Sequence, residues 1–283
     1  MRFLLIVLMM LTISACSMPP EIKENKATIE RVKHVPNLLI KHNIEHKNYR
    51  LHYVSAGKKN KPSIVFVHGT PGGWGTFATY FEQSELLKHF QFFSIDRPGW
   101  GQSTYPSGDF PVSLSEQSRL LAPLLKEIAT TSQQKVILVG HSYGGSLVPK
   151  LAADYPEYVR GILILAGDVG PKLAQARWFN VALHYIPSFL IPDPWYESNK
   201  EVLAIAPSLE KSQDQYRSIT QPITFLQGTD DELVRPDNAN YAKTLFKRSN
   251  LEVKWLKDAG HIINLTNVAD VVAAIKALDK RSL

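Results

Sequence analysis

Residues 135–145 read KVILVGHSYGG, and this stretch is the strongest single indication of the fold. Its first part, 136–139, is a short run of aliphatic residues, which is typical of a strand buried in a parallel sheet. Gly140 and Gly144 flank Ser142 in the pattern G-x-S-x-G, where missing β-carbons permit a tight turn. The stretch therefore predicts a strand, a sharp turn that carries Ser142, and a following helix.

The rest of the chain repeats this alternation of short apolar runs with longer helical segments. Such alternation predicts an α/β domain whose mostly parallel central sheet is flanked by helices. The predicted strands are 63–67, 91–95, 161–165, 223–226 and 251–256, after a hairpin of 38–45 and 49–55, and the predicted helices include 113–131, 236–246 and 268–278.

Composition favours a globular body in the part of the chain that follows the N-terminus. Of the 283 residues, 44% are hydrophobic and 20% are charged, which is unlike a disordered chain. The net charge of +6 is dispersed, without a dense block of lysine and arginine, so no nucleic-acid partner is expected. We expect one domain over residues 37–283, and the sequence leaves its oligomeric state open.

The N-terminal residues have the features of an export signal peptide. Arg2 precedes an apolar stretch, 3–13, that is too short to span a membrane comfortably. The following ISAC resembles the lipobox of bacterial lipoprotein signal peptides, which implies removal of residues 1–15 and lipidation of Cys16, the only cysteine. An ordinary secretory signal is the alternative. Residues 16–36, rich in lysine and glutamate, are expected to form a flexible tether.

This resemblance also implies a location. Several acyl chains on one residue would anchor the protein stably to a membrane, where a single chain is marginal. Ser17 follows the cysteine, and in Gram-negative lipoproteins a serine at this position usually permits export to the outer membrane. We therefore expect the bacterial cell envelope, with the periplasmic face of the outer membrane favoured over the inner membrane.

Three further motifs each follow a predicted strand, in a fixed order. HGTPGG occupies 68–73 after the first central strand, and DRPGWGQS occupies 96–103 after the second. GTDD at 228–231 and AGH at 259–261 follow the last two strands. Together with G-x-S-x-G, these motifs resemble those of the α/β-hydrolase superfamily over about residues 40–280. The order Ser, Asp, His along the chain is the one expected of that fold.

The resemblance implies a role for particular residues. Ser142 is the expected nucleophile, His261 the base, and Asp231 the acid, with Asp230 and Asp168 as alternatives for the acid. The backbone N–H groups of Thr70 and Tyr143 are the expected oxyanion donors, unless HGTPGG is only a surface turn. His68, Asp96 and Ser103 are expected to be structural, and His141 to point away from the reaction centre. No metal ion or organic cofactor is implied.

One long interval interrupts the alternation of strands and helices. Residues 170–218 contain no clear strand and many aromatic residues and prolines, so we expect a small, mostly helical cap insertion over the sheet. Its aromatic side chains would pack the insertion onto the body, and some would line a substrate pocket.

These expectations favour a hydrolase that acts on small-molecule esters or amides. A serine at the turn argues against haloalkane dehalogenases and epoxide hydrolases, because those relatives use aspartate there. A carboxylic ester hydrolase is the first hypothesis. A peptidase similar to proline iminopeptidases, suggested by HGTPGG, is the second, and a carbon–carbon bond hydrolase is the third. A noncatalytic, membrane-anchored binding protein on the same fold is the alternative of another class.

Overall fold

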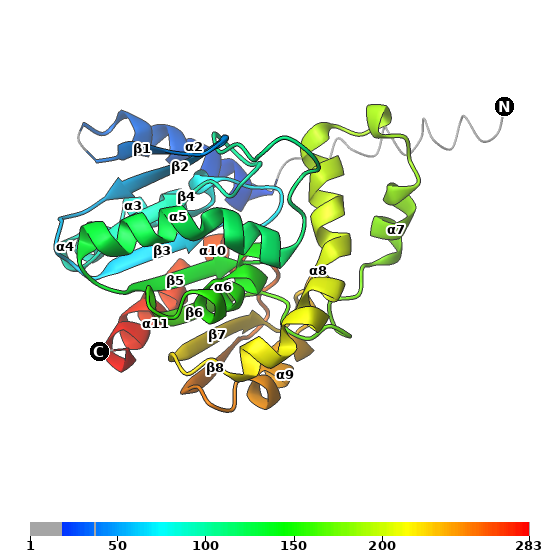
Figure 1. The fold of residues 1–283 in the computed structure, drawn as a ribbon. Helices are drawn as coiled ribbons and strands as arrows, with labels where there is room; N and C mark the ends of the chain where they lie inside the picture. The colour runs from blue at the N-terminus through cyan, green and yellow to red at the C-terminus, as the bar shows by residue number, and fades with distance from the viewer. Residues whose placement is uncertain (1–18, 37, 283) are drawn as a thin grey trace.

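A computed structural model describes residues 19–36 and 38–282, which form a layered α/β structure (Figure 1). Its eight-stranded sheet has the order β1-β2-β4-β3-β5-β6-β7-β8. The strands are β1 (Ile40–His46), β2 (Tyr49–Ala56), β3 (Ser63–Val67), β4 (Gln91–Ile95), β5 (Val136–His141), β6 (Val159–Leu165), β7 (Ile223–Gly228) and β8 (Leu251–Leu256). The predicted signal peptide (1–15) and Cys16 lie outside the described residues.

Strand pairing confirms the predicted α/β-hydrolase architecture. From β4 to β8 all neighbouring strands are parallel, whereas β1 pairs with β2, and β2 with β4, in antiparallel register. Because side chains alternate across a strand, β3 directs Val65 and Val67 to one face and Ile64 and Phe66 to the other. Both faces of the central strands are therefore buried, as their continuous apolar runs predict.

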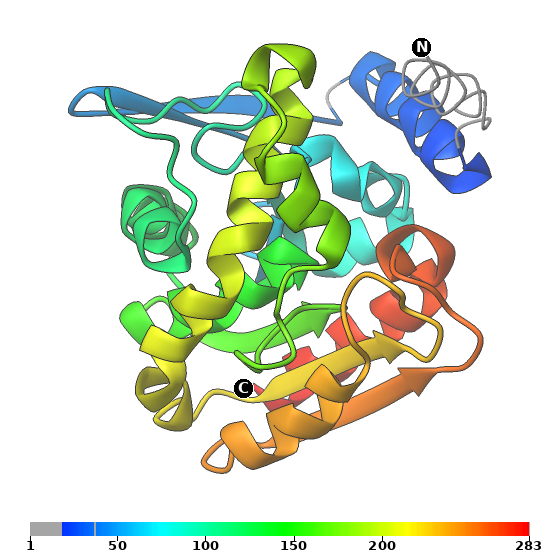
Figure 2. The ribbon, with the colours of Figure 1, turned by 90° about the vertical axis from the view of Figure 1, so that its right-hand side faces the viewer.

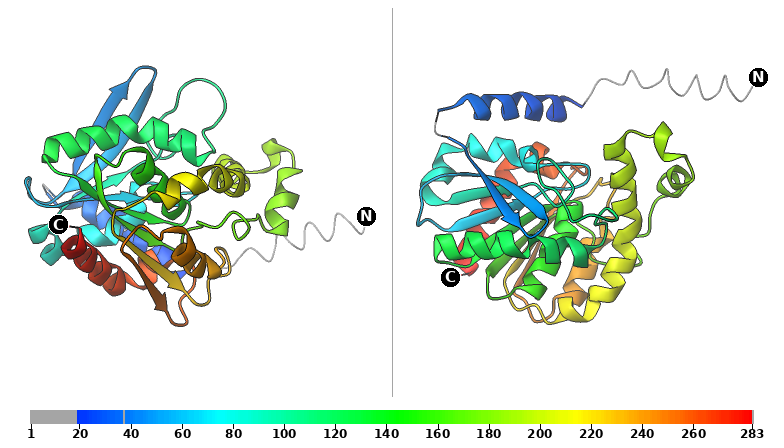
Figure 3. Two further views of the ribbon diagram at one scale, coloured as in Figure 1. Left: turned by 60° about the horizontal axis from the view of Figure 1, so that its bottom comes forward. Right: turned by 45° about the horizontal axis from the view of Figure 1, so that its top comes forward.

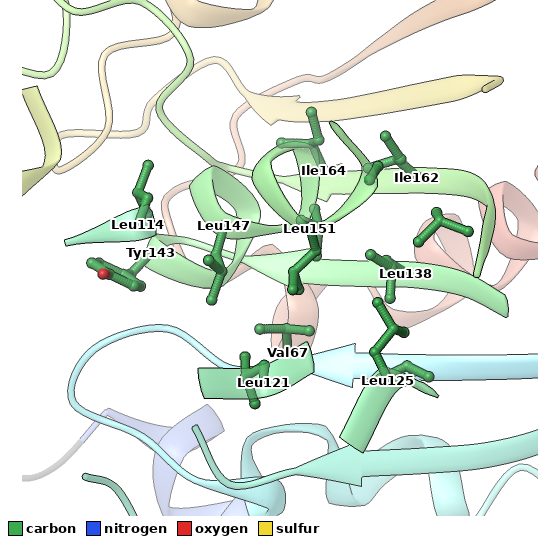
Figure 4. Close-up of a cluster of buried hydrophobic side chains, with 14 of the residues drawn as sticks. Val67, Leu114, Leu121, Leu125, Leu138, Tyr143, Leu147, Leu151, Ile162 and Ile164 are labelled. Carbon is green, nitrogen blue, oxygen red and sulfur yellow. The ribbon is translucent and has the colours of Figure 1, made fainter. Parts of the chain in front are cut away.

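Helices cover both faces of the sheet. On one face lie α5 (Leu114–Ser132), α6 (Tyr143–Asp154) and α9 (Asp237–Leu245), whose side chains join one hydrophobic cluster. Figure 4 shows part of this cluster, in which Leu121 and Leu125 of α5 and Leu147 and Leu151 of α6 lie close to Val67, Leu138, Ile162 and Ile164 of strands β3, β5 and β6. The other face carries η1 (Trp74–Phe77), α3 (Ala78–Phe81), α4 (Ser84–His89), α10 (Ile263–Thr266) and α11 (Val268–Arg281).

The chain between β6 and β7 forms the helical insertion expected over 170–218. It contains α7 (Trp178–His184), the short η2 (Ser188–Leu190) and the long α8 (Asp193–Arg217). Helix α8 crosses the carboxyl ends of the strands and contacts α6 and α5, while α7 lies on the outer side of α8 (Figures 1 and 2). We refer to α7, η2 and α8, with their connecting loops, as the cap.

The structure differs from the expected flexible tether over residues 16–36. Residues Pro20–His34 form helix α2, which packs against η1, α3 and α10. Val32 is buried, and Asn25 donates a hydrogen bond to the Gly75 carbonyl at 3.1 Å. Ile29 lies against the α-carbon of Gly75, where a β-carbon would meet its Cδ1 at 2.6 Å. The tether expectation is therefore wrong for α2, which belongs to the folded body.

Within residues 19–36 and 38–282, no helix is both long and apolar enough to span a membrane.

Candidate active site

Ser142 lies at the turn between β5 and α6, in a backbone conformation that serine rarely adopts. Its φ is 56° and its ψ is −122°, so the turn is strained, as at many functional sites. A β-carbon on Gly140 would meet the Gly144 carbonyl oxygen at 2.2 Å, and one on Gly144 would meet the Val67 oxygen at 2.1 Å. Glycine is therefore required at both positions, as the sequence predicts.

His261 connects Ser142 to Asp231. Its Nε2 lies 2.9 Å from the Ser142 Oγ, and its Nδ1 lies 2.9 Å from the Asp231 Oδ2. His261 follows β8 and Asp231 follows β7, so the carboxyl ends of three strands bring the side chains together. When Nδ1 carries the proton and donates it to Asp231, Nε2 is free to accept a proton from the serine hydroxyl.

The Asp231 carboxylate is held by several donors. Burial would raise its pKa, but the hydrogen bond from His261 and the backbone N–H of Val234 lower the pKa below its ordinary value. Gln227 donates a further hydrogen bond to Oδ2 at 3.1 Å, and the N–H groups of Leu233 and Val234 reach Oδ1 at 2.9 Å. Asp231 is therefore ionised at neutral pH and fixed in orientation.

The two other candidate acids have different partners. Asp230 is exposed and accepts a hydrogen bond from Thr229 at 2.8 Å. Asp168 is buried and accepts a hydrogen bond from Asn238 at 2.8 Å. Burial raises the pKa of Asp168 to about 6. Of the three carboxylates, the structure places Asp231 against His261.

The HGTPGG loop lies beside the nucleophile. A β-carbon on Gly69 would meet the Ser142 Cβ at 2.9 Å, so the loop backbone touches the serine. Tyr143 is the first residue of α6, where an N–H group has no partner within the helix. In the described part of the chain, neither the Thr70 N–H nor the Tyr143 N–H donates a hydrogen bond to the protein. Both donors expected at the oxyanion are thus free.

Two buried histidines support the loops around Ser142. His68 accepts a hydrogen bond from the Arg97 N–H at Nε2 (3.0 Å), and its Nδ1 lies 2.7 Å from the Gly69 oxygen. His141 directs its Nε2 to the His261 carbonyl oxygen at 3.0 Å. Burial lowers the pKa of each ring to about 3, so both are neutral at physiological pH. Both act as structural donors, as expected of His68.

Asp96 organises the DRPGWGQS loop, as expected of a structural residue. Its carboxylate accepts hydrogen bonds from the Trp74 N–H at 2.7 Å and the Gln102 N–H at 3.0 Å, and it lies 2.7 Å from the His52 Nδ1. The Ser103 hydroxyl donates to the Asp96 carbonyl oxygen at 2.7 Å. These contacts fix where Arg97, the next residue, enters the site.

Arg97 and Glu201 form a buried ion pair that the sequence analysis missed. The Arg97 guanidinium donates to Glu201 of α8 at 2.6 and 2.9 Å, and both side chains are fully buried. The same guanidinium donates to the carbonyl oxygens of His68 at 3.1 Å and Gly69 at 3.0 Å, and it stacks over the Tyr143 ring. The pair therefore connects the cap to the loop that carries the expected oxyanion donors.

A signal for this pair was present only in part. Arg97 directly follows Asp96 in a recognised motif, but arginine on a loop is usually exposed. Glu201 lies within α8, whose sequence has many other charged residues, and nothing in the spacing separates Glu201 from them. Pairing across about a hundred residues of sequence could be seen only in the structure.

The model of the "Alpha/beta hydrolase family" matches residues 64–275, well over half of the chain. The chain belongs to this family. The α/β hydrolase is 29% identical to mouse (Mus musculus) epoxide hydrolase 3 over 159 residues, which cover 54% of the chain and 41% of that relative. It spans less than half the length of the curated relatives that it matches first.

Two other similarities cover more of the hydrolase. It is 26% identical to a 2-hydroxy-6-oxononadienedioate/2-hydroxy-6-oxononatrienedioate hydrolase from Paraburkholderia phymatum, over 76% of the chain and 70% of that relative. The crystal structure of Cfl2 from Burkholderia cenocepacia superposes with a TM-score of 0.68 at 16% identity, covering 84% of the chain and 95% of Cfl2. At this identity the superposition supports the fold alone.

Proposed function

We propose that this α/β hydrolase cleaves carboxylic esters through an acyl-enzyme intermediate on Ser142. The observation that carries the proposal is the continuous chain Ser142–His261–Asp231, with 2.9 Å at both contacts. His261 accepts the hydroxyl proton through Nε2 while the serine oxygen attacks the ester carbonyl carbon. Asp231, ionised and fixed by its other donors, stabilises the imidazolium that forms. His261 then gives the proton to the leaving alcohol.

The second half of the reaction uses the same groups. His261 removes a proton from water, which attacks the acyl carbon, and Ser142 leaves with that proton. In both steps the N–H groups of Thr70 and Tyr143 donate to the oxygen that becomes negative. Removing one such donor typically costs about 3 kcal/mol of barrier. The Arg97–Glu201 pair positions the loop of the Thr70 donor and acts on the reaction only through it.

Ser142 weighs against epoxide opening, despite the similarity to epoxide hydrolases. A carboxylate that opens an epoxide forms an ester, which water can cleave in a second step. A serine oxygen that opened an epoxide would form an ether, which this set of groups has no means to hydrolyse. An acyl group on serine, in contrast, is an ester.

Two other hydrolytic reactions use the same triad and compete with this proposal. The similarity over 70% of the Paraburkholderia enzyme favours carbon–carbon bond hydrolysis of a dienedioate as the second candidate. The HGTPGG loop suggests cleavage of an N-terminal proline residue as a further possibility. Ser142, His261 and Asp231 keep their roles in all three reactions. Only the preferred substrate therefore distinguishes the three reactions from one another.

The proposal includes a lipid anchor on Cys16 and residence in the bacterial cell envelope. It rests on the ISAC sequence and the short apolar stretch before it. Mass spectrometry of the protein purified from bacterial membranes tests it directly. A mature N-terminus at Cys16 with attached acyl groups is expected, and a mature chain that begins elsewhere would refute the anchor.

Hydrolysis of p-nitrophenyl acetate, butyrate and octanoate by the full chain and by Ser142→Ala tests the catalytic role. We expect a loss of at least about a thousandfold in the variant. Ser146→Ala is the matched control, because this buried serine lies one helical turn further along α6 and bonds to the Asp168 N–H at 2.9 Å. It should keep its activity within about tenfold.

A fluorophosphonate probe and two further substrates separate the alternatives. The probe should label the parent and Ser146→Ala but leave Ser142→Ala unlabelled. If the folded parent hydrolyses none of the three esters and does not react with the probe, a noncatalytic binding protein would be favoured. Turnover of a 2-hydroxy-6-oxodienedioate or of proline p-nitroanilide, in preference to every ester, would replace ester cleavage with one of the other two reactions.

A further inference from the structure

The outer side of the cap exposes an unusual density of large apolar side chains. Phe189 is 85% exposed, Trp178 81% and Tyr185 80%. We call this surface the cap face; it comprises Trp178, Phe179, Tyr185, Ile186, Phe189, Leu190 and Trp195. A group of large, exposed apolar side chains on one element of a soluble domain usually marks an interaction site.

Folding of the cap does not explain these side chains. Helix α7 and η2 contain no buried residue, although α8 beside them has many. An open pocket of about 480 Å³ lies between α7 and α8, and its lining includes Val181 of α7, Leu203 of α8 and the charged Lys172 and Glu210. The aromatic side chains of the cap face are absent from the lining of this pocket. The expectation that they pack the insertion onto the body is wrong for the most exposed of them.

Charge is nearly absent from the same segment. Between Trp178 and Trp195 the sequence is WFNVALHYIPSFLIPDPW, with Asp193 as its only acidic residue and no lysine or arginine. The exposed Lys172 precedes it, as does the half-buried Arg177, whose Nη2 donates a hydrogen bond to the Glu232 carbonyl oxygen at 2.8 Å. Aromatic and aliphatic side chains with cations at the margin form the pattern of surfaces that insert into the headgroup region of a bilayer.

We propose that the cap face is a membrane-contact surface, which enters the headgroup region of a phospholipid bilayer. Its tryptophans and tyrosine can place their rings among the acyl chains while their polar groups stay near the headgroups. This contact is separate from the lipid on Cys16 and does not require it. Because the cap lies over the carboxyl ends of the strands, the contact turns the edge that holds Ser142 toward the lipid surface.

The position of α2 supports this orientation. The N-terminal end of α2 and the cap lie on the same side of the molecule (Figure 3, right). Because α2 packs onto the body, Pro20 is a fixed point, and only three residues separate it from Cys16 in the sequence. A lipid on Cys16 would therefore hold the cap side toward the bilayer. A flexible tether would have left the orientation open.

Quenching of tryptophan fluorescence by brominated phospholipids tests the contact. The full chain carrying Ser142→Ala, so that no lipid is hydrolysed, is reconstituted in vesicles of phosphatidylcholine and phosphatidylglycerol, with and without bromine on the acyl chains. Two of the five tryptophans, Trp178 and Trp195, lie on the cap face, so bromine should remove up to about two-fifths of the emission. Trp74 and Trp100 are buried and should not respond.

Conservative variants identify the source of the quenching. The double variant Trp178→Phe with Trp195→Phe keeps the cap face apolar and should lose the quenching. Trp255→Phe, which replaces the exposed tryptophan of β8, should keep it. Phe189→Asp should reduce it, whereas Ile40→Asp, at an exposed position on β1, should not.

Three results would overturn the proposal. Vesicle-bound protein whose emission is unaffected by bromine would show that the cap face does not touch lipid. Quenching that persists in the double tryptophan variant would place the contact elsewhere. Chemical cross-links between cap faces of two copies, together with absent quenching, would assign the surface to a dimer. None of these readouts depends on hydrolysis, so the outcome is independent of the proposed ester activity.

Discussion

The two sides of the cap differ in whether their side chains have contact partners within the chain. On the inner side, Glu201 of α8 is fully buried and its carboxylate meets Arg97, Trp100 and Gln117. On the outer side, Phe189 and Trp178 remain mostly exposed. Polar groups near Ser142 thus have specific partners within the chain, whereas the apolar groups of the outer side have few.

This difference distinguishes the buried contacts that folding requires from the exposed side chains that folding does not constrain. A buried charge without a partner costs far more than an exposed aromatic ring, so the inner contacts must form for the cap to close on the body. The outer surface imposes no such requirement, and its composition points to a partner outside the chain. The contrast predicts large effects for changes near the site and small effects on folding for changes on the outer side.

The largest effect is expected at the acid that orients His261. Asp231→Asn removes the negative charge and the preference for the productive tautomer, so kcat/KM for a p-nitrophenyl ester should fall by about 10⁴. Asp168→Asn is the matched control, since Asp168 is also buried at a strand end but bonds to Asn238. Its kcat/KM should fall by less than about tenfold. The reverse ranking would assign the acid to Asp168.

The ion pair between Arg97 and Glu201 should dominate the stability of the cap contact. Glu201→Gln leaves the Arg97 guanidinium buried without its counter-charge, so the free energy of unfolding should fall by about 3–5 kcal/mol in urea titrations. Glu210→Gln, at an exposed position on the same helix, should change it by less than about 0.5 kcal/mol.

Replacing both members of the pair sharpens that result. The double variant Arg97→Met with Glu201→Met removes both charges and keeps apolar volume, so it should recover part of the stability lost in Glu201→Gln. A cost of the double variant equal to the sum of the costs of Arg97→Met and Glu201→Met alone would mean that the two side chains act independently, which contradicts the pairing seen in the structure.

Asp168 should make stability depend on pH. Because burial raises its pKa to about 6 in the folded state, folding favours the protonated form. That contribution is complete below the ordinary carboxyl pKa and is lost as the pH rises through about 6. From pH 4 to pH 7 the loss should be on the order of 2–3 kcal/mol.

Comparison with Asp168→Asn isolates this contribution. Asparagine can still accept the hydrogen bond from Asn238 but does not titrate, so the variant should gain stability relative to the parent as the pH rises from 4 to 7. Asp231, whose lowered pKa acts in the opposite sense, is present in both proteins and cancels. A difference that stays constant with pH would contradict the raised pKa.

The sequence predicted the central architecture because each element has a strong local signal. The strands from Ser63 to Gly228 carry mostly apolar runs, and the glycines beside Ser142 occupy positions where a β-carbon would collide. The positions of Ser142, Asp231 and His261 followed from motifs at strand ends. The bounds of strands and helices that a short stretch of sequence identifies were therefore predicted to within a few residues.

What the sequence did not reveal depends on contacts between distant segments. Helix α2 is dominated by lysine and glutamate, and its apolar positions Ile22, Ile29 and Val32 are too few to stand out. The direction of the cap aromatics depends on how α7 sits on α8, which no local pattern specifies. The partners of Arg97 and Asp168 likewise come from elements far away in the chain.

Helix α2 offers a direct test of its place in the fold. Val32→Ala removes two buried methyl groups between α2 and the sheet-covering helices, so the free energy of unfolding should fall by about 1–3 kcal/mol. Lys26→Ala, at an exposed position of the same helix, is the control and should have little effect. If both changes had equal and negligible effects on the free energy of unfolding, the segment would be a flexible tether and not part of the folded body.

The smallest effect on folding is expected on the outer side of the cap. Phe189→Ser should change the free energy of unfolding by less than about 0.5 kcal/mol, because the ring is mostly exposed and loses few contacts. Phe66→Ser, in the core beneath α3, should cost at least about 3 kcal/mol. Urea titrations of both variants without lipid provide the comparison. A cost at Phe189 approaching that at Phe66 would mean that the ring supports the fold after all. The large apolar side chains of the outer cap would then have a structural explanation, and the reason to seek a partner outside the chain would disappear.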